Sequence, residues 1–181
     1  ALRALDIADN IVELLSKSMG ELPAETQEVL KLAACLGNLF DPDILSFIAR
    51  KKRKYVEVDL KVAVQEGVIF LQNGQYKFIH DSLQQAAYSL IAEEVKKETH
   101  LEIGRILLEI IPEEEREERI FDIINQLNVG ADLLSTTAEQ IQLAELNLVA
   151  GQKAKAGAAF ADAKKYTEMG LDLLGTDPWQ D

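Results

Sequence analysis

The chain has 181 residues, 48% of them hydrophobic, which is enough for one domain of ordinary size or two small ones. Lysine and arginine number 19 against 31 aspartates and glutamates, so the net charge of -12 at pH 7 disfavours binding to nucleic acid. No apolar run approaches the roughly 18 to 20 residues that span a bilayer. The single cysteine, Cys35, excludes an internal disulfide and fits a cytoplasmic location. We expect its side chain to be buried and inert.

The acidic excess is unevenly distributed along the chain. Residues 1–92 contain 10 basic and 12 acidic side chains, whereas residues 93–181 contain 9 and 19. This asymmetry predicts two units, one over residues 1–92 and the other over residues 93–181. Because the sequence starts at Ala1 without a methionine and enters a helical pattern within a few residues, we expect it to be a piece of a longer protein.

The first half has the pattern of several helices followed by a β-hairpin. Helical periodicity predicts four helices, over about residues 5–19, 23–36, 41–48 and 59–66. Two β-rich runs follow at residues 68–71 and 76–79, and the Asn73-Gly74 pair between them is a hairpin turn signal. This order of elements is typical of a winged-helix domain with a small two-stranded β-hairpin.

The remainder of the chain is entirely helical in pattern. Helices are predicted over residues 82–91, 94–111, 113–127 and 158–174. Before the last of these, a capping box at Thr136 and Glu139 opens a long helix that bears apolar residues from Ile141 to Ala150. Small residues crowd the last two helices, as in tetratricopeptide-like helix pairs that pack closely. The predicted fold is therefore mainly α, a winged helix followed by an α-helical, tetratricopeptide-like bundle.

The motifs of common active sites are absent from the sequence. No glycine begins a phosphate-binding P-loop, and there is no nucleophile elbow, zinc helix or paired-cysteine site. A metal site is improbable because His80, His100 and Cys35 are the only nitrogen or sulfur side chains suited to bind one. We therefore expect no catalytic residue, no metal and no bound cofactor within this chain.

The stretch around His80 and Asp81 is where the sequence hints at chemistry. Tyr76, Phe78 and His80 alternate with other residues as in a strand, and Asp81 or Ser82 is a natural N-cap for the next helix. On the structural interpretation, the His80 imidazole satisfies a buried backbone group while Asp81 caps the helix. On the functional interpretation, His80 or the nearby N–H groups contact the phosphate of a nucleotide held by another domain.

Two other features have simpler interpretations. His100 lies at helical spacing and is expected to pack or hydrogen-bond between helices without a chemical role. The basic cluster Arg50–Lys54 precedes the helix with which a DNA-binding winged helix would enter the major groove, but that helix carries a mostly acidic face. A solvated C-terminal turn that favours the helix dipole is the preferred interpretation of this cluster, and an acidic or phosphate partner within the same protein is the next.

Four segments resemble the region that follows the ATPase core in large multidomain signalling kinases of bacteria and fungi. They are Leu22–Asn38, Phe78–Tyr88, His100–Arg105 and Ala144–Ala154. Those proteins combine kinase modules with an ATPase of the STAND class (signal-transduction ATPases with numerous domains). In related ATPases a Met-His-Asp motif of the winged helix places its histidine near the ADP phosphate. Ile79-His80-Asp81 is similar to that motif, with isoleucine in place of methionine.

This resemblance implies a non-catalytic regulatory fragment. His80 would sense the phosphate of ATP or ADP held by an upstream ATPase domain of the same chain, and Asp81 would be its structural neighbour. The helical half would sense a signal or bind a protein partner. Two alternatives remain: a transcription regulator that binds DNA through Arg50–Lys54 and Lys61, or an interaction scaffold with an exposed apolar groove between its last helices.

Overall fold

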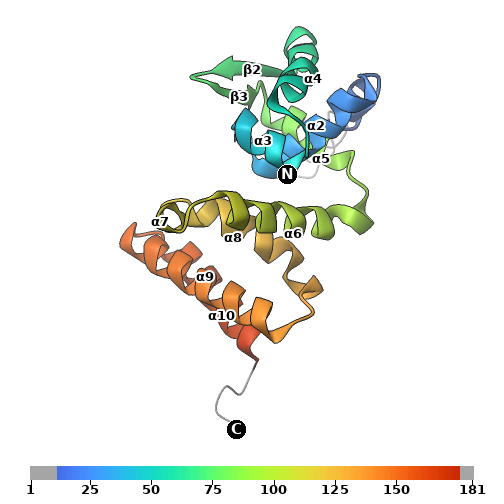
Figure 1. Ribbon diagram of the computed structural model, residues 1–181. Helices are drawn as coiled ribbons and strands as arrows, with labels where there is room; N and C mark the ends of the chain where they lie inside the picture. Colours follow the sequence, from blue (N-terminus) through green and yellow to red (C-terminus); the bar gives the residue numbers. More distant parts are fainter. Residues whose placement is uncertain (1–11, 176–181) are drawn as a thin grey trace. The chain divides into compact units, whose positions relative to one another are not determined.

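The computed structural model describes residues 12–175, which belong to two compact units, Ala1–Glu94 and Val95–Asp181 (Figure 1). The charge asymmetry of the sequence predicts a boundary between residues 92 and 93, and the independence of the two units as domains stays a prediction. Of the first predicted helix, residues 12–19 are helical, and the preceding part lies outside the described residues. No helix within residues 12–175 is long and apolar enough to cross a membrane.

The first unit is a winged helix. After the helical segment 12–19 its elements are α2 (Ala24–Leu36), β1 (Leu39–Phe40), α3 (Pro42–Ile48), α4 (Arg53–Gln65), β2 (Ile69–Gln72), β3 (Gln75–Phe78) and α5 (Asp81–Ser89). The strands form an antiparallel sheet in the order β1-β3-β2. The predicted β2-β3 hairpin is confirmed, and Asn73 and Gly74 both have positive φ, as its tight turn requires. Strand β1 is an addition that the sequence analysis did not predict.

Helix α4 begins six residues earlier than predicted, at Arg53 instead of Asp59. Its buried residues Val56, Leu60 and Ala63 are spaced four and three apart, which is one face of a helix. Arg53 also donates from Nε to the Glu57 carboxylate at 2.8 Å, a pair one turn apart that supports the first turn. The predicted start is wrong because a run of basic residues has the pattern of a solvated turn, whereas Arg53 and Lys54 lie in the helix.

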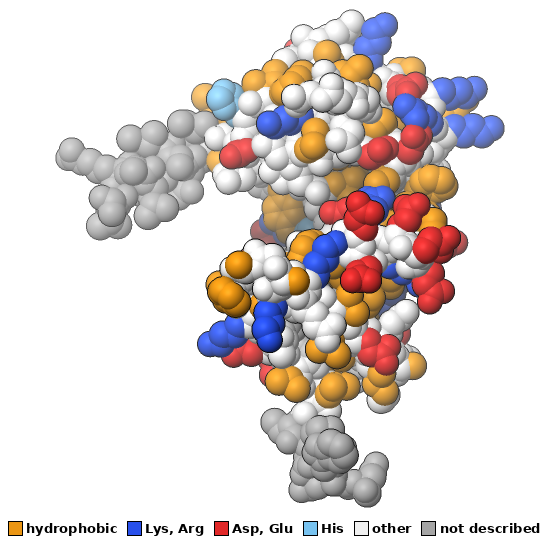
Figure 2. All heavy atoms as spheres, turned by 90° about the vertical axis from the view of Figure 1, so that its left-hand side faces the viewer, with side chains coloured by type: hydrophobic (Ala, Val, Ile, Leu, Met, Phe, Trp, Pro, Cys, Tyr) orange, Lys and Arg blue, Asp and Glu red, His pale blue; other side chains and the backbone are white. Residues whose placement is uncertain are grey.

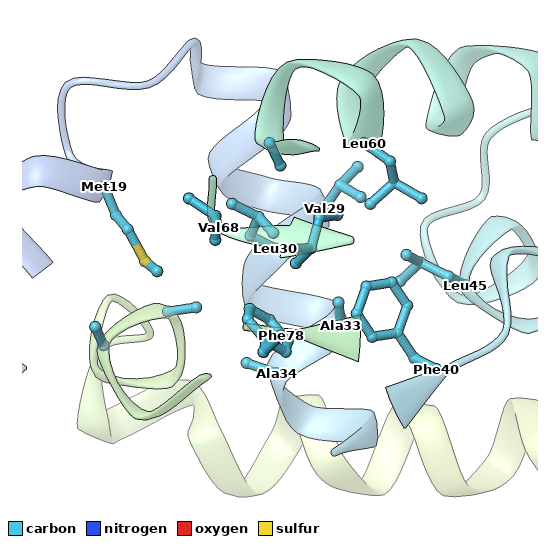
Figure 3. Packing of buried hydrophobic residues seen from close by; sticks show 14 of the residues in the cluster. Met19, Val29, Leu30, Ala33, Ala34, Phe40, Leu45, Leu60, Val68 and Phe78 are labelled. Carbon is cyan, nitrogen blue, oxygen red and sulfur yellow. The ribbon is translucent and has the colours of Figure 1, made fainter. Parts of the chain in front are cut away.

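The core of the first unit lies between α2, α4 and the sheet. Side chains from these elements point toward one another (Figure 3), and the largest that are fully buried include Phe78, Leu30, Leu45 and Leu60. The rings of Phe40 and Phe78 meet with centroids 5.6 Å apart and tilted by 54°, a favourable aromatic geometry. The two strands that carry these rings are thereby fixed against α2.

The second unit is helical throughout its described part. Its elements are α6 (Glu93–Ile110), α7 (Glu113–Arg116), α8 (Ile120–Leu127), a 3-10 helix η1 (Asn128–Leu133), α9 (Thr137–Ala156) and α10 (Phe160–Leu174). The helix predicted over residues 113–127 is in fact two helices, α7 and α8. The predicted capping box is confirmed: Thr136 Oγ1 accepts from the Glu139 N–H at 3.2 Å and donates to the Glu139 carboxylate at 2.9 Å.

Helices α9 and α10 lie side by side and antiparallel (Figure 1). Glycines permit this close approach, because a Cβ at Gly151 would lie 2.9 Å from Thr167 Oγ1 and one at Gly170 would lie 3.2 Å from the Ala144 carbonyl oxygen. The small residues noted in the sequence therefore lie where two helix backbones meet. The likeness to tetratricopeptide repeats stays a prediction.

A pair of asparagines joins α9 to η1 through side-chain amides. Asn147 Nδ2 donates to Asn128 Oδ1 at 2.9 Å, and Asn128 Nδ2 donates to Asn147 Oδ1 at 3.0 Å. Asn147 is completely buried and also donates to the Leu143 carbonyl at 3.0 Å. The polar groups of its side chain are therefore satisfied inside an otherwise apolar contact.

Candidate functional site

The His80-Asp81 pair lies at the corner where β3 gives way to α5. Strand β3 ends at Phe78, Ile79 and His80 follow, and His80 keeps an extended backbone with φ -139° and ψ 148°. Phe78 is buried, whereas His80 is exposed, so the alternation predicted from Tyr76 to His80 stops two residues before the histidine. The imidazole is therefore presented to the outside of the unit.

The structural interpretation of this pair is wrong in both its parts. His80 itself is the N-cap residue of α5, and its side chain makes no capping hydrogen bond. Asp81 is the first residue of the helix, and its carboxylate accepts from Asn38 Nδ2 at 2.6 Å instead of capping the backbone. Neither Asp81 nor Ser82 is the N-cap. The acidic group in the first turn still favours the helix dipole.

Backbone hydrogen bonds hold the corner on both sides. The Phe78 N–H donates to the Asn38 carbonyl at 2.9 Å, and the Ile79 N–H donates to the Val68 carbonyl at 3.1 Å. Asn38 thus bonds the corner twice, through its backbone and through its side chain. Its Oδ1 is buried and has no hydrogen-bond partner among the described residues, which costs free energy that the Asp81 contact offsets.

Asn38 is the residue of this site that sequence reasoning missed. It is 43 residues away from Asp81 in the sequence. The available signal was its position directly after Gly37, the glycine that ends α2 with φ 121°. An asparagine just past the end of a helix can use its side chain for a hydrogen bond to another part of the chain. Nothing local pointed to Asp81 as its partner.

His80 also forms part of the wall of a cleft with a volume of about 770 Å³. Apolar side chains form most of the lining, including those of Leu15, Met19, Leu22, Val68 and Leu83. The ionisable lining residues within residues 12–175 are His80, Glu21 and Glu66. Two carboxylates without a lysine or arginine in this described lining disfavour an anion, so the cleft has the wrong charge for a nucleotide of its own.

The basic cluster Arg50–Lys54 is partly neutralised by carboxylates. Arg53 binds Asp43 at 2.5 Å and Glu57 at 2.8 Å, and Lys51 binds Asp59 at 3.1 Å. The hydrogen bonds that Arg53 donates to Glu57 and, next in size, to Asp43 raise the pKa of Arg53 above its ordinary value. Figure 2 shows lysine and arginine side chains interspersed with acidic ones on this unit. These pairs leave less free positive charge for a nucleic-acid backbone.

The position of the cluster corrects the preferred interpretation. Arg50 and Lys51 follow the end of α3, as that interpretation expected, but Lys52 is the N-cap of α4 and Arg53 begins it. Cations at the start of a helix oppose its dipole. Ion pairs with Asp43 and Glu57, rather than the dipole, stabilise Arg53 in this place.

The other sequence-predicted residues are structural. His100 is buried, and its Nδ1 lies 2.6 Å from Gln126 Oε1, so the predicted hydrogen bond between helices is confirmed. Cys35 is buried, as expected. Within residues 12–175 no group of three or more histidine, cysteine, aspartate or glutamate side chains is placed to hold a metal ion.

The fold defines a winged-helix unit followed by a helical unit, with a histidine displayed at the strand-to-helix corner of the first. No family model matches the sequence. No solved structure matches it either.

The chain is similar to hybrid signal transduction histidine kinase G of Dictyostelium discoideum, with 29% identity over 222 aligned positions. The alignment covers 93% of this chain but 6% of that protein. The chain is thus distantly homologous to one region of a large hybrid signalling histidine kinase.

Proposed function

We propose that this chain is a non-catalytic regulatory region of a multidomain signalling kinase, in which the winged helix works as a latch that responds to the nucleotide state. The distant homology to part of a hybrid signal transduction histidine kinase supports the signalling context. The proposed partner is an upstream ATPase domain of the STAND class in the same polypeptide, and ATP or ADP bound by that domain is the nucleotide.

The observation that carries the proposal is the exposed His80 at a firmly held corner. Its imidazole makes no hydrogen bond or ion pair with the described part of the chain, although Asn38 and Val68 fix the backbone beside it. A side chain that extends from a firmly held backbone and has unused donors is available to an external acceptor. The acidic cleft beside it favours a phosphate that is held by another domain over one bound here.

In the proposed mechanism, a ring N–H of His80 donates to a phosphate oxygen of ADP in the neighbouring ATPase domain. The N-terminal turn of α5 adds its partial positive charge to the same contact. Docking through His80 stabilises a closed, inactive state, and exchange for ATP or binding of an effector to the helical unit releases it. The winged helix then biases an equilibrium that the kinase modules respond to.

The test uses the complete polypeptide that carries this sequence. We expect His80→Ala to weaken ADP binding by about tenfold or more, because it removes a hydrogen bond to a charged group, and to raise basal autophosphorylation. Gln85→Ala, at an exposed position of α5, is the matched control and should change neither quantity. Parental ADP affinity together with parental basal output in His80→Ala would rule out the latch.

The second unit is proposed as the sensor or partner-binding surface. The supporting observation is an apolar groove between α9 and α10, to which Ile141, Leu148 and Leu171 contribute exposed side chains. An exposed groove of this kind is the feature expected of an interaction scaffold.

A further inference from the structure

The groove between α9 and α10 runs along the helix pair. It consists of two hollows of about 320 Å³ and 260 Å³, which share Leu148 and Thr167 in their linings and are therefore continuous. Gly151 and Ala163 line the first hollow, and Ala144 and Gly170 line the second. The small floor residues leave a depression that only side chains from outside the hairpin can fill.

The side chains along the two walls recur at the spacing of a helix-packing seam. On α9 they are Ile141, Glu145, Leu148, Gln152 and Lys155, and on α10 they are Phe160, Lys164, Thr167, Leu171 and Leu174. Both series follow steps of four and three residues, with an average of 3.5, which is the repeat of helices that pack in bundles. Leu148, Phe160 and Leu171 are each more than half exposed, at 54%, 68% and 60%.

Helix α9 therefore presents apolar side chains on two faces. One is already used, because Leu143, Asn147, Ala150 and Ala154 are buried within the unit. The other is the wall of the groove. On the opposite wall, which α10 forms, the Thr167 hydroxyl donates to the Ala163 carbonyl at 2.8 Å, so it needs no polar partner from outside. Two helices that expose a second seam are half of a four-helix arrangement.

The charges along the groove determine which partner completes it. Glu145 lies toward one end and Lys155 toward the other, about 15 Å further along α9 at 1.5 Å per residue. Neither makes an ion pair within residues 12–175, whereas Lys164 and Glu168 on α10 pair with each other at 3.6 Å. An antiparallel copy, related by a twofold axis near Ala150, would place each Glu145 opposite the other copy's Lys155. A parallel copy would oppose like charges.

We propose that the occupant of the groove is a second copy of this chain, whose α9–α10 hairpin packs antiparallel against the first to form a four-helix bundle. A twofold interface requires a self-complementary surface, and this groove is apolar along its centre with opposite charges at its two ends. This proposal is independent of the latch, since it involves neither His80 nor a nucleotide.

The distribution of charge makes this hairpin suitable for self-association. From Thr137 to Leu174 it carries four lysines against five carboxylates, a balance of -1 in a chain of -12. Much of the acidic excess of this unit lies instead at the five exposed glutamates of residues 113–118, on a face where Figure 2 shows acidic side chains gathered. Two hairpins can therefore approach each other without strong repulsion.

The test is the molar mass of the chain by sedimentation velocity and light scattering, from about 10 µM to about 1 mM. We expect a monomer–dimer equilibrium that Leu148→Asp shifts by at least tenfold toward the monomer, because it places an unpaired charge at the centre of the interface. Leu133→Asp is the matched control, since Leu133 is 46% exposed in η1 and does not line the groove. It should leave the equilibrium unchanged.

Charge reversal tests the orientation and the identity of the partner. Glu145→Lys alone and Lys155→Glu alone should each weaken the dimer, and the double variant should restore it, because the pairs across the twofold axis re-form with exchanged signs. A chain that stays monomeric up to about 1 mM with a parental circular dichroism spectrum would overturn the proposal. A dimer that Leu148→Asp leaves intact, or one that the double variant fails to restore, would do the same.

Discussion

Truncation of Phe78 to alanine should unfold the first unit preferentially. This ring has no exposed surface, meets Phe40 at 5.6 Å between centroids and lies in β3, two residues before His80. The Phe78 N–H also donates to the Asn38 carbonyl at 2.9 Å. The side chain therefore connects the core of the unit to the corner that presents the histidine.

The size of the effect follows from the burial of the ring. Removing a fully buried phenylalanine costs about 3–5 kcal/mol, from lost transfer free energy and from the cavity left behind. A small domain has a free energy of unfolding of about 5–15 kcal/mol, so the variant loses a large share of it. With a urea dependence of about 2 kcal/mol per molar, the midpoint of unfolding should fall by about 2 M.

The assay is urea unfolding followed by circular dichroism, combined with hydrogen exchange and mass spectrometry to assign the loss to a unit. Phe47→Ala is the matched control, because it makes the same truncation in the same unit at a ring that is 57% exposed. The control should lose no more than about 1 kcal/mol, since less than half of its ring surface is buried. Equal midpoints for the two variants would refute the core described for this unit.

The second unit provides two further predictions. In thermal unfolding, Gly104→Ala should destabilise it by about 1–3 kcal/mol, because the new Cβ would lie 2.6 Å from Cγ of Leu127 and overlap that side chain. Gly157→Ala is the control and should be neutral, because its Cβ would meet no atom nearer than 3.6 Å. The hydrogen bond from Arg105 and, next in size, that from Thr136 hold the pKa of Glu139 below its ordinary value. The contact therefore stabilises the unit at pH values above the pKa that Glu139 has in the unfolded chain. This stabilisation is lost as the pH falls through the pKa of Glu139 in the folded chain. Arg105→Gln should raise the pKa of Glu139 in a carbon-13 NMR titration. The pKa of Asp132, which Lys97 lowers, is the control and should not change. An unchanged pKa of Glu139 would contradict the role given to Arg105.

Local chemistry determined those parts of the fold that were predictable from the sequence. The Asn73-Gly74 turn, the capping box at Thr136 and the end of α2 before Gly37 each depend on residues within a few positions of one another. Helical periodicity likewise located α10, because its apolar residues recur at helical spacing. These features need no knowledge of the remainder of the chain.

Long-range contacts determined the parts that were not predictable. Strand β1 has two residues, and it is a strand only because Leu39 and Phe40 pair with β3 from 36 or more positions away. The start of α4 depends on Arg53 reaching Asp43 in α3 as well as Glu57 in its own helix. A run of five basic residues has no local pattern that reveals such partners.

The candidate site shows the same division. The sequence located His80 and Asp81 at a strand-to-helix corner, which the structure has, but the N-cap residue is His80 instead of Asp81 or Ser82. Asp81 bonds Asn38 instead of the backbone, and that contact takes away the capping role expected of its carboxylate. The groove between α9 and α10 was anticipated only as the mark of a scaffold, because sequence periodicity does not distinguish a buried face from an exposed one.

The amide pair of Asn128 and Asn147 has a consequence for how the second unit selects one arrangement of its helices. Both carboxamides are satisfied only when α9 lies at a single height against η1. Sliding α9 by one turn would separate the two amides and leave the buried one, Asn147, without this partner, at a cost that an apolar side chain in the same place would not impose. The pair therefore sets the register of α9 against η1. Leucines in its place would add stability, yet they would allow neighbouring alignments of α9 that the asparagines disfavour.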